Sequence, residues 1–284
     1  MNASTPSVRA SGVSAMFDTR FTPAIMGIIN VTPDSFSDGG VHFDHPKAVH
    51  SAMQMEEDGA AIIDVGGEST RPGSEEVAAD EELARVIPVI EGIRKRSAIP
   101  ISIDTRKARV AEAALDAGAN VINDVSALRH DPQMRALAAK RDVPVILMHM
   151  RGEPRTMQED IQFDDVVDDV ARELTEWRDE AQTAGVSKIF VDPGIGFGKT
   201  FDHNLEILAR CNELTRVAPV VIGASRKGFI GHLTGRPAGT SRACGSLAAV
   251  AAARRGGAAI VRVHDVRETA DFLKVLGAIE ARAR

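Results

Sequence analysis

Polar side chains follow several short apolar runs of this chain, at positions where strands would end. Asp64, Asp104 and Asp192 each sit directly on a run of aliphatic residues, and Asn123 ends another. An unpaired carboxylate at such a position is costly to desolvate, so a shared binding site explains these residues better than structural hydrogen bonding. Asp104, Asn123 and Asp192 offer acceptors and one amide, which suit a planar heterocycle with an amino-amide edge.

A second group of residues offers positive charge and hydrogen-bond donors. Arg262 and His264 are two positions apart on an expected strand, so both side chains point to the same face. Other loops add further donors, namely Arg71, Lys227, Ser69 and Thr70. Together they suit an anion such as diphosphate. The residues therefore predict a site in two parts, in which acceptors for a heterocycle lie beside donors for phosphate.

Three other patterns carry less weight. Gly198-Lys199-Thr200 looks like the end of a P-loop, but the first glycine of that motif would fall on Pro193. Gly194-Ile195-Gly196 looks like a dinucleotide fingerprint, but its third glycine would fall on Lys199. His149 and His264 have no third zinc ligand at usable spacing, so Met148-His149-Met150 is interpreted as packing.

The polar residues belong to a regular alternation of short apolar runs and helical stretches. The expected strands are 25–30, 61–65, 101–104, 121–123, 145–148, 188–192, 220–223 and 259–263. The expected helices are 47–58, 80–96, 107–117, 132–140, 163–184, 204–217, 240–255 and 267–283. Nearly continuous apolar strands are typical of a parallel sheet covered by helices on its outer face.

Eight such units predict a (β/α)₈ TIM barrel, a single α/β domain whose active site lies at the carboxyl ends of the strands. A doubly wound open sheet is the competing architecture. We expect residues 1–12 to be disordered and residues 13–284 to form the barrel domain. The loop Val31–Gly40 is long for a connection of this kind, and its Gly39-Gly40 pair could act as the hinge of a lid. The polar loop Glu153–Asp160 receives no chemical role.

Composition and charge narrow the classes of partner. The chain has 284 residues and a net charge of −6, which argues against broad nucleic-acid binding and against a polybasic membrane anchor. Its longest apolar run, Leu247–Ala253, is far shorter than the roughly 20 residues that a membrane span needs. The first residues lack the apolar core of a signal peptide. We therefore expect a cytoplasmic protein that acts on small molecules and binds neither nucleic acid nor membranes.

In combination, these segments resemble dihydropteroate synthase of folate biosynthesis. The resemblance spans roughly residues 25–270, and its most specific parts are Met26–Gly40, Asp64–Gly73 and Arg262–Val266. Shorter matching segments lie between them in the same order: 102–104, 122–124, 147–150, 192–199 and 225–227. Members of this family join (7,8-dihydropterin-6-yl)methyl diphosphate to 4-aminobenzoate and release diphosphate. The resemblance therefore implies a pterin-binding barrel and a transferase activity.

The resemblance also implies a role for individual residues. The pterin would be held by Asp104, Asn123, Asp192 and Lys227, with Asp64 supporting that pocket. The diphosphate would be bound by Asn30, Thr70, Arg262 and His264, with Mg²⁺ ligated by Asn30. The aminobenzoate pocket would be shaped by Phe36, Pro72, Phe197 and Ser225, with Lys227 lining it as well. Catalysis would fall to Lys227, Asp104, Arg262 and His264. A homodimer is implied by the same resemblance, and the Ala/Leu-rich helices near the C-terminus are one candidate contact.

Two other classes of protein stay open at this point. A pterin-binding barrel of the methyltetrahydrofolate–corrinoid methyltransferase type could share the Asp/Asn set, but it would need neither a diphosphate clamp nor the Val31–Gly40 lid. A non-enzymatic paralogue would be marked by loss of Asn30, Lys227, Arg262 or His264, all of which are present. No Ser or Cys nucleophile with a base partner is evident, so we expect no covalent enzyme intermediate.

Overall fold

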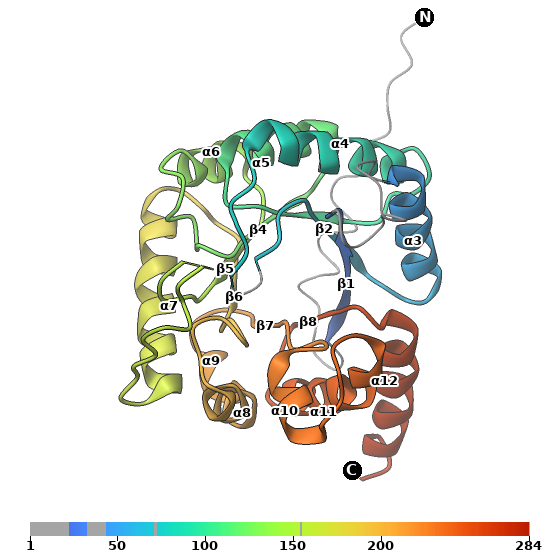
Figure 1. Cartoon of the computed structure of the whole chain (residues 1–284), viewed down its shortest axis with the longest axis vertical. Helices are drawn as coiled ribbons and strands as arrows, with labels where there is room; N and C mark the ends of the chain where they lie inside the picture. The colour runs from blue at the N-terminus through green and yellow to red at the C-terminus, as the bar shows by residue number, and fades with distance from the viewer. Residues whose placement is uncertain (1–22, 33–43, 71–72, 154, 284) are drawn as a thin grey trace, which may run out of the picture.

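Eight parallel strands form a ring, and helices surround it (Figure 1). The structure is a computed structural model that describes residues 23–32, 44–70, 73–153 and 155–283. The strands are β1 (Ala24–Asn30), β2 (Ile62–Gly66), β3 (Ile101–Asp104), β4 (Val121–Asp124), β5 (Val145–Met148), β6 (Ile189–Asp192), β7 (Val221–Ile222) and β8 (Ile260–Val263). Each expected strand is found within two residues of its expected ends.

The pairing of the strands decides between the two architectures. Each strand from β1 to β5 pairs with the next, β1 also pairs with β8, and β8 pairs with β7. A bridge between Val191 of β6 and Val220, just before β7, closes the ring. The backbone N–H of Val191 also donates to Pro219 O at 3.0 Å, the ordinary length of such a bond. This closed order is that of a (β/α)₈ barrel and excludes the doubly wound open sheet.

Side chains alternate along each strand between the interior of the barrel and the layer under the helices. The interior is filled by an apolar cluster of Met26, Ile62, Val121, Ile146, Phe190, Val221, Ala259 and Ile260. Toward the carboxyl ends of the strands, the inward positions become polar at Asp64, Asp104, Asn123, Asp192 and Arg262. The apolar cluster therefore forms the floor beneath a polar mouth.

The outer layer is made of the helices that connect the strands. They are α3 (His45–Glu57), α4 (Ala79–Arg94), α5 (Ala108–Ala117), α6 (Met134–Arg141), α7 (Val166–Thr183), α8 (Phe201–Ala209), α9 (Cys211–Leu214), α10 (Gly228–Thr234), η1 (Thr240–Arg242), α11 (Ala243–Arg255) and α12 (Val266–Glu280). Their apolar faces pack on the outer faces of the strands in one large buried cluster. Local caps set several of their ends, as where Asp165 accepts the backbone N–H groups of Val167 and Asp168 at the start of α7.

Two parts of the helical layer differ from the sequence-based expectation. The helix expected over 204–217 begins earlier, because the Thr200 hydroxyl accepts the backbone N–H of His203 in a capping box. It then breaks at Arg210, whose φ of −107° and ψ of 22° are not helical. Helix α10 was not expected, because its seven residues include two glycines and give little periodic signal.

Some expectations concern residues that lie outside the described part of the chain. They include the disorder of residues 1–12, most of the Val31–Gly40 lid, Phe36, Arg71 and Pro72. The assignment of residues 13–284 to one domain likewise stays a prediction. Among the described residues, none of the helices has the length and apolar character required to span a bilayer.

Candidate active site at the barrel mouth

An arginine joins two carboxylates in the barrel mouth. The Arg262 Nε donates to Asp64 Oδ2 at 2.6 Å, and its Nη2 donates to Asp104 Oδ2 at 2.7 Å. Strand register explains this meeting, because β1 lies between β2 and β8 and Met26 is level with both Ile62 and Arg262. From that level the long Arg262 side chain reaches upward past Asp64 to Asp104. The Asn123 amide completes the group by donating to Asp64 Oδ2 at 3.2 Å.

Burial and charge set the protonation of this cluster. Burial raises the pKa of Asp104 to about 7, although the Arg262 charge opposes the shift. Burial disfavours the Arg262 cation, yet Asp64 and Asp104 hold the pKa of its guanidinium above the usual value. Near neutral pH, Asp104 can therefore carry or release a proton, whereas Arg262 stays charged.

The sequence-based interpretation separated carboxylates for a heterocycle from cations for phosphate, and the structure joins them at Arg262. Asp192 lies at the same mouth, since a Cβ added at Gly223 would be 3.5 Å from Asp192 Oδ2 and 4.0 Å from Arg262 Cδ. Burial raises the pKa of Asp192, and the backbone N–H of Gly194, which donates to Oδ1 at 2.7 Å, opposes that shift. The expected partners thus meet at one end of one barrel.

Two glycines keep the mouth open between these carboxylates. A Cβ at Gly66 would lie 3.3 Å from the Asp104 Cβ, and one at Gly223 would approach Asp192 as described. Bare backbone at these two positions leaves room for a flat ligand between the carboxylates.

His264 is neutral rather than cationic. Burial lowers the pKa of His264 to about 3, and the nearby Arg262 charge lowers it further. Its Nδ1 lies 3.0 Å from the Ser225 hydroxyl, which also accepts the His264 backbone N–H at 3.2 Å. The expected patch of cations therefore contains a neutral imidazole that Ser225 orients, and this differs from the charge assumed in the sequence analysis.

The segment Ser225–Lys227 changes direction at a strained residue. Arg226 has a φ of 59°, a left-handed conformation that is rare for a residue with a side chain. Its Nε donates to Asp265 at 3.1 Å, which holds it in place. The chain reversal lets Ser225 reach His264 while the Lys227 Nζ lies 4.1 Å above the centre of the Phe197 ring.

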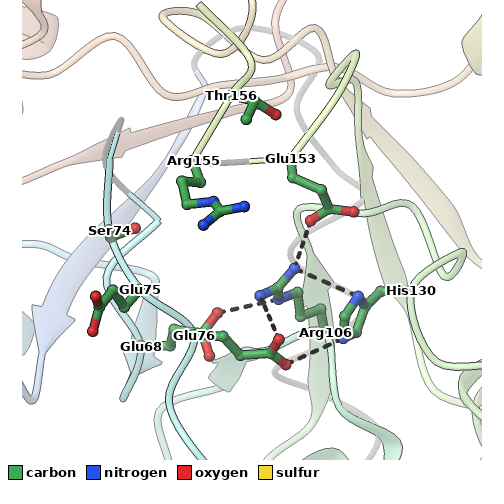
Figure 2. Close-up of a pocket in the computed structure, with 9 residues that line it drawn as sticks. All are labelled: Glu68, Ser74, Glu75, Glu76, Arg106, His130, Glu153, Arg155 and Thr156. Carbon is green, nitrogen blue, oxygen red and sulfur yellow. Dashed lines mark hydrogen bonds and ion pairs between the residues drawn. The ribbon is translucent and has the colours of Figure 1, made fainter.

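A cluster of ion pairs holds the loop after β2 beside the mouth (Figure 2). Glu68 begins this loop, and its carboxylate accepts Arg106 Nε at 3.1 Å and the backbone N–H of Val77 at 3.1 Å. Lys107 also bonds to Glu68. Glu68 therefore ties the two ends of the loop together. Between those ends lies Thr70, which is half-buried.

Figure 2 shows how Arg106 extends this cluster to other loops. Its guanidinium reaches Glu153, in the loop after β5, at 2.8 Å and Glu76 at 3.6 Å, and it lies 3.4 Å from His130 Nδ1. These side chains line a cleft of about 510 Å³. One buried arginine thus connects the loops that follow β2, β4 and β5.

The remaining expected residues lie apart from the carboxylate cluster. Asn30 ends β1, is level with Gly66 and is half-buried. Within the described ranges, neither Asn30 nor Thr70 makes a side-chain hydrogen bond to that cluster. No group of three His, Cys, Asp or Glu side chains able to hold a metal occurs among the residues that the structure describes. Sequence reasoning missed the structural roles of Glu68, Gly66 and Gly223, although the first two lie within the segment Asp64–Gly73 and the third ends the expected strand 220–223.

The fold and this mouth define a class of protein. A family model for the pterin-binding enzymes matches residues 26–264, and the chain belongs to that family. The dihydropteroate synthase of Synechocystis sp. is 45% identical over 267 residues, which are 93% of this chain and 92% of the relative.

Two solved structures agree with this result. The Xanthomonas albilineans dihydropteroate synthase with 4-aminobenzoic acid has a TM-score of 0.86 and 47% identity, covering 91% of this chain and 93% of that one. The same enzyme in complex with 7,8-dihydropteroate has a TM-score of 0.83 and 45% identity, covering 91% and 94%. The expected barrel and the resemblance to dihydropteroate synthase, a transferase of folate biosynthesis, are thereby confirmed.

Proposed function

We propose that this barrel mouth condenses (7,8-dihydropterin-6-yl)methyl diphosphate with 4-aminobenzoate to give 7,8-dihydropteroate and diphosphate. The observation that carries the proposal is the buried cluster of Asp64, Arg262, Asp104 and Asn123, with Asp192 beside it. Its acceptors, its amide and the open space beside Gly66 and Gly223 match a flat ring with several N–H groups.

The pterin would lie between the inward carboxylates. Asp192 would accept N–H groups of the ring, and their donation would favour its charged form against the effect of burial. Asn123 would donate to a ring carbonyl or accept an N–H, while Asp64 fixes the amide. Asp104, with a pKa of about 7, would face the part of the ring where positive charge develops as the diphosphate departs. Lys227 would close the ring pocket from the side of Phe197.

The diphosphate would extend toward Asn30, Thr70, Arg262 and His264. A neutral His264 supplies one N–H donor, and an approaching anion would raise its pKa, which strengthens that contact. Arg262 is held by two carboxylates, so it offers a donor that is already oriented before the ligand binds. Such fixed donors would stabilise the leaving group as its C–O bond breaks.

The aminobenzoate would enter beside Phe197 and Ser225, with Phe36 and Pro72 completing the pocket from loops outside the described residues. Its amino nitrogen attacks the methylene, the new N–C bond replaces the C–O bond, and the nitrogen then loses one proton. Closure of the loops that carry Phe36 and Pro72 would exclude water during this step.

A Mg²⁺ ion would be held by Asn30 together with the diphosphate. Mg²⁺ commonly keeps several waters and uses few protein ligands beside substrate phosphates, so one amide oxygen at the mouth fits it better than a preformed cage. When bound, the ion would neutralise charge on the departing diphosphate.

We further propose a homodimer, with α12 as its contact. Val275 and Ile279 lie one turn apart on this helix, and their exposed fractions are 61% and 62%. A dimer would appear by light scattering at twice the chain mass of 30.3 kDa. A cytoplasmic location stays a prediction.

The direct test incubates the purified chain with the pterin diphosphate, labelled 4-aminobenzoate and Mg²⁺. We expect labelled dihydropteroate and one diphosphate per product, and loss of turnover when a chelator removes the metal. Binding of the pterin without product would instead favour a non-enzymatic paralogue. Transfer of a methyl group from methyltetrahydrofolate to a corrinoid protein, with no pteroate formed, would favour the methyltransferase class.

The ion-pair cluster of Figure 2 gives a separate prediction. Arg106→Met removes the guanidinium that holds Glu68, Glu76 and Glu153, so the loop carrying Thr70 should loosen and become more negative. We expect the KM for the pterin diphosphate to rise about tenfold in steady-state assays. The control is Arg109→Met, which removes an exposed ion pair between Arg109 on α5 and Asp80 on the preceding helix, α4. Equal KM values for the two variants would contradict this role of Arg106.

A further inference from the structure

Two motifs that the sequence analysis set aside meet behind the mouth, where Lys199 lies against His149. Lys199 is 2% exposed, and His149 is fully buried. The reaction proposed above uses neither residue. Burying an ammonium group is costly unless its donors are all paired, so its partners indicate what it holds in place.

The Lys199 ammonium is fully paired. Its Nζ lies 2.9 Å from His149 Nδ1 and donates to the Phe197 carbonyl at 3.0 Å and the His149 carbonyl at 3.4 Å. An ammonium has three N–H donors, and each has one acceptor here. Lys199 therefore joins the residue after β5 to the backbone of Phe197, in the loop after β6.

The loop 193–199 is pressed against this end of β5. Gly194 has a φ of +69°, and a Cβ at that position would lie 1.9 Å from the His149 carbonyl oxygen. Only glycine fits such a close approach of two backbone segments. The hydrogen bonds of Lys199 and the close approach of Gly194 thus both hold the loop 193–199 against His149.

The other side of His149 is fixed by α7. Its Nε2 lies 3.1 Å from Glu173 Oε2, and its ring stacks on Trp177 with the centroids 5.3 Å apart. With Nε2 donating to Glu173, Nδ1 is left as the acceptor for Lys199. Burial lowers the pKa of His149 to about 3, so the imidazole is neutral, as this arrangement requires.

The charge of Lys199 is balanced by groups from several elements. Burial lowers its pKa to about 7, the carboxylates of Asp192 and Glu173 oppose this, and the cations Arg151 and Lys227 add to it. The three hydrogen bonds need the ammonium form, which these two carboxylates support.

The fastened loop in turn places two residues of the mouth. The Lys227 Nζ lies 4.1 Å from the centre of the Phe197 ring in a cation–π contact. A Cβ at Gly196 would lie 3.3 Å from the Lys227 Cδ. A shift of the loop would therefore move Phe197, the wall of the aminobenzoate pocket, directly, whereas Lys227 would lose a packing partner but keep its own backbone position after β7.

We propose that Lys199, acting with His149, is a positioning residue that fixes the loop 193–199 and thereby sets Phe197 in the aminobenzoate pocket. The identity of the ligand in this inference rests on the proposed function. Wild-type turnover is measured first, so failure of the proposed function and failure of this inference give different results.

The test compares Lys199→Met with a matched control, Lys188→Met. Lys188 precedes the same strand β6 at its opposite end, where it pairs with Asp142 at 3.1 Å on the surface. We expect Lys199→Met to raise the KM for 4-aminobenzoate about tenfold, with kcat and the KM for the pterin diphosphate changing less than about threefold. The control variant Lys188→Met should have the wild-type values of kcat and of both KM constants.

A second variant and a spectroscopic readout keep the test decisive if Lys199→Met folds poorly. Lys199→Gln keeps two N–H donors on a side chain that is one bond shorter, so it should show a smaller rise in the KM for 4-aminobenzoate than Lys199→Met. Trp177, the only tryptophan of the chain, stacks on His149 and should change its fluorescence in the unliganded Lys199 variants but not in Lys188→Met. The proposal is overturned if the KM for 4-aminobenzoate is unchanged. It is also overturned if kcat falls and both KM values rise by equal factors.

Discussion

Replacing Arg262 by methionine should abolish turnover and destabilise the barrel. The change removes the partner of Asp64 and Asp104, which leaves two carboxylates in a buried mouth without their counter-charge. Breaking a buried ion pair in this way typically costs about 3–5 kcal/mol. Binding of the pterin should weaken together with binding of the diphosphate, because the guanidinium supports the carboxylates as well as the anion.

The loss of stability should depend on pH in a defined direction. The pKa of Asp104 is already raised to about 7 in the folded protein, and removal of Arg262 would raise it further. A carboxyl whose pKa is higher folded than unfolded disfavours folding as pH rises from the unfolded value of about 4 to the folded value. The free energy of unfolding of Arg262→Met should therefore be higher at pH 5 than at pH 8.

Denaturant unfolding of both proteins at these two pH values checks the prediction. The control is Arg267→Met. Arg267 lies near the start of α12 and forms a surface ion pair with Asp58, so its loss should leave stability and turnover unchanged. Equal stability of Arg262→Met and the wild type at pH 8 would mean that the buried ion pairs do not support the mouth.

Replacing Lys227 by alanine should lower kcat/KM at least tenfold, which corresponds to about 1.4 kcal/mol. The change removes the ammonium that lies over the Phe197 ring and near Asp192. The pKa of Asp192 should then rise, because Lys227 is one of the cations that lower it. Both the pterin contact and the wall of the aminobenzoate pocket are lost together.

Steady-state kinetics and direct binding of the pterin check this second prediction. Lys274→Ala, an exposed lysine on α12, is the control. Lys227→Arg should restore part of the activity, because it keeps a cation that can stack on the ring. Full activity of Lys227→Ala would show that Lys227 does not belong to the active site.

The fold was largely predictable because each strand is a short aliphatic run, and four of them follow a helix that ends at a glycine, namely Gly59, Gly118, Gly185 and Gly257. The expected ranges 101–104 and 145–148 match β3 and β5, where the apolar run ends abruptly in a polar residue. The break at Arg210 and the helix α10 were not predictable. Helix α10 gives little periodic signal, and at Arg210 a long-range contact accompanies the break, since Arg210 Nη1 donates to Asp165, the residue before α7, at 2.8 Å.

The members of the carboxylate cluster were predictable from the sequence, but their contacts were not. Asp64 and Arg262 are 198 residues apart in the chain, and only the pairing of β1 with both β2 and β8 brings them to 2.6 Å. Sequence reasoning therefore assigned them to different halves of the ligand. It also treated His264 as a cation, since burial, which lowers its pKa, is a property of the fold.

The order of apolar runs and polar ends by itself predicted eight βα units and placed Asp64, Asp104, Asn123, Asp192 and Arg262 at the ends of their strands, because parallel strands carry their final residues to one rim. Only the tertiary structure decided which of those side chains are paired, charged or held in place. The pairing of Arg262 with two carboxylates and the burial of Lys199 against His149 both depend on strand register and closure of the ring. Strand register and ring closure set the distances of a few ångströms between residues that are far apart in the chain.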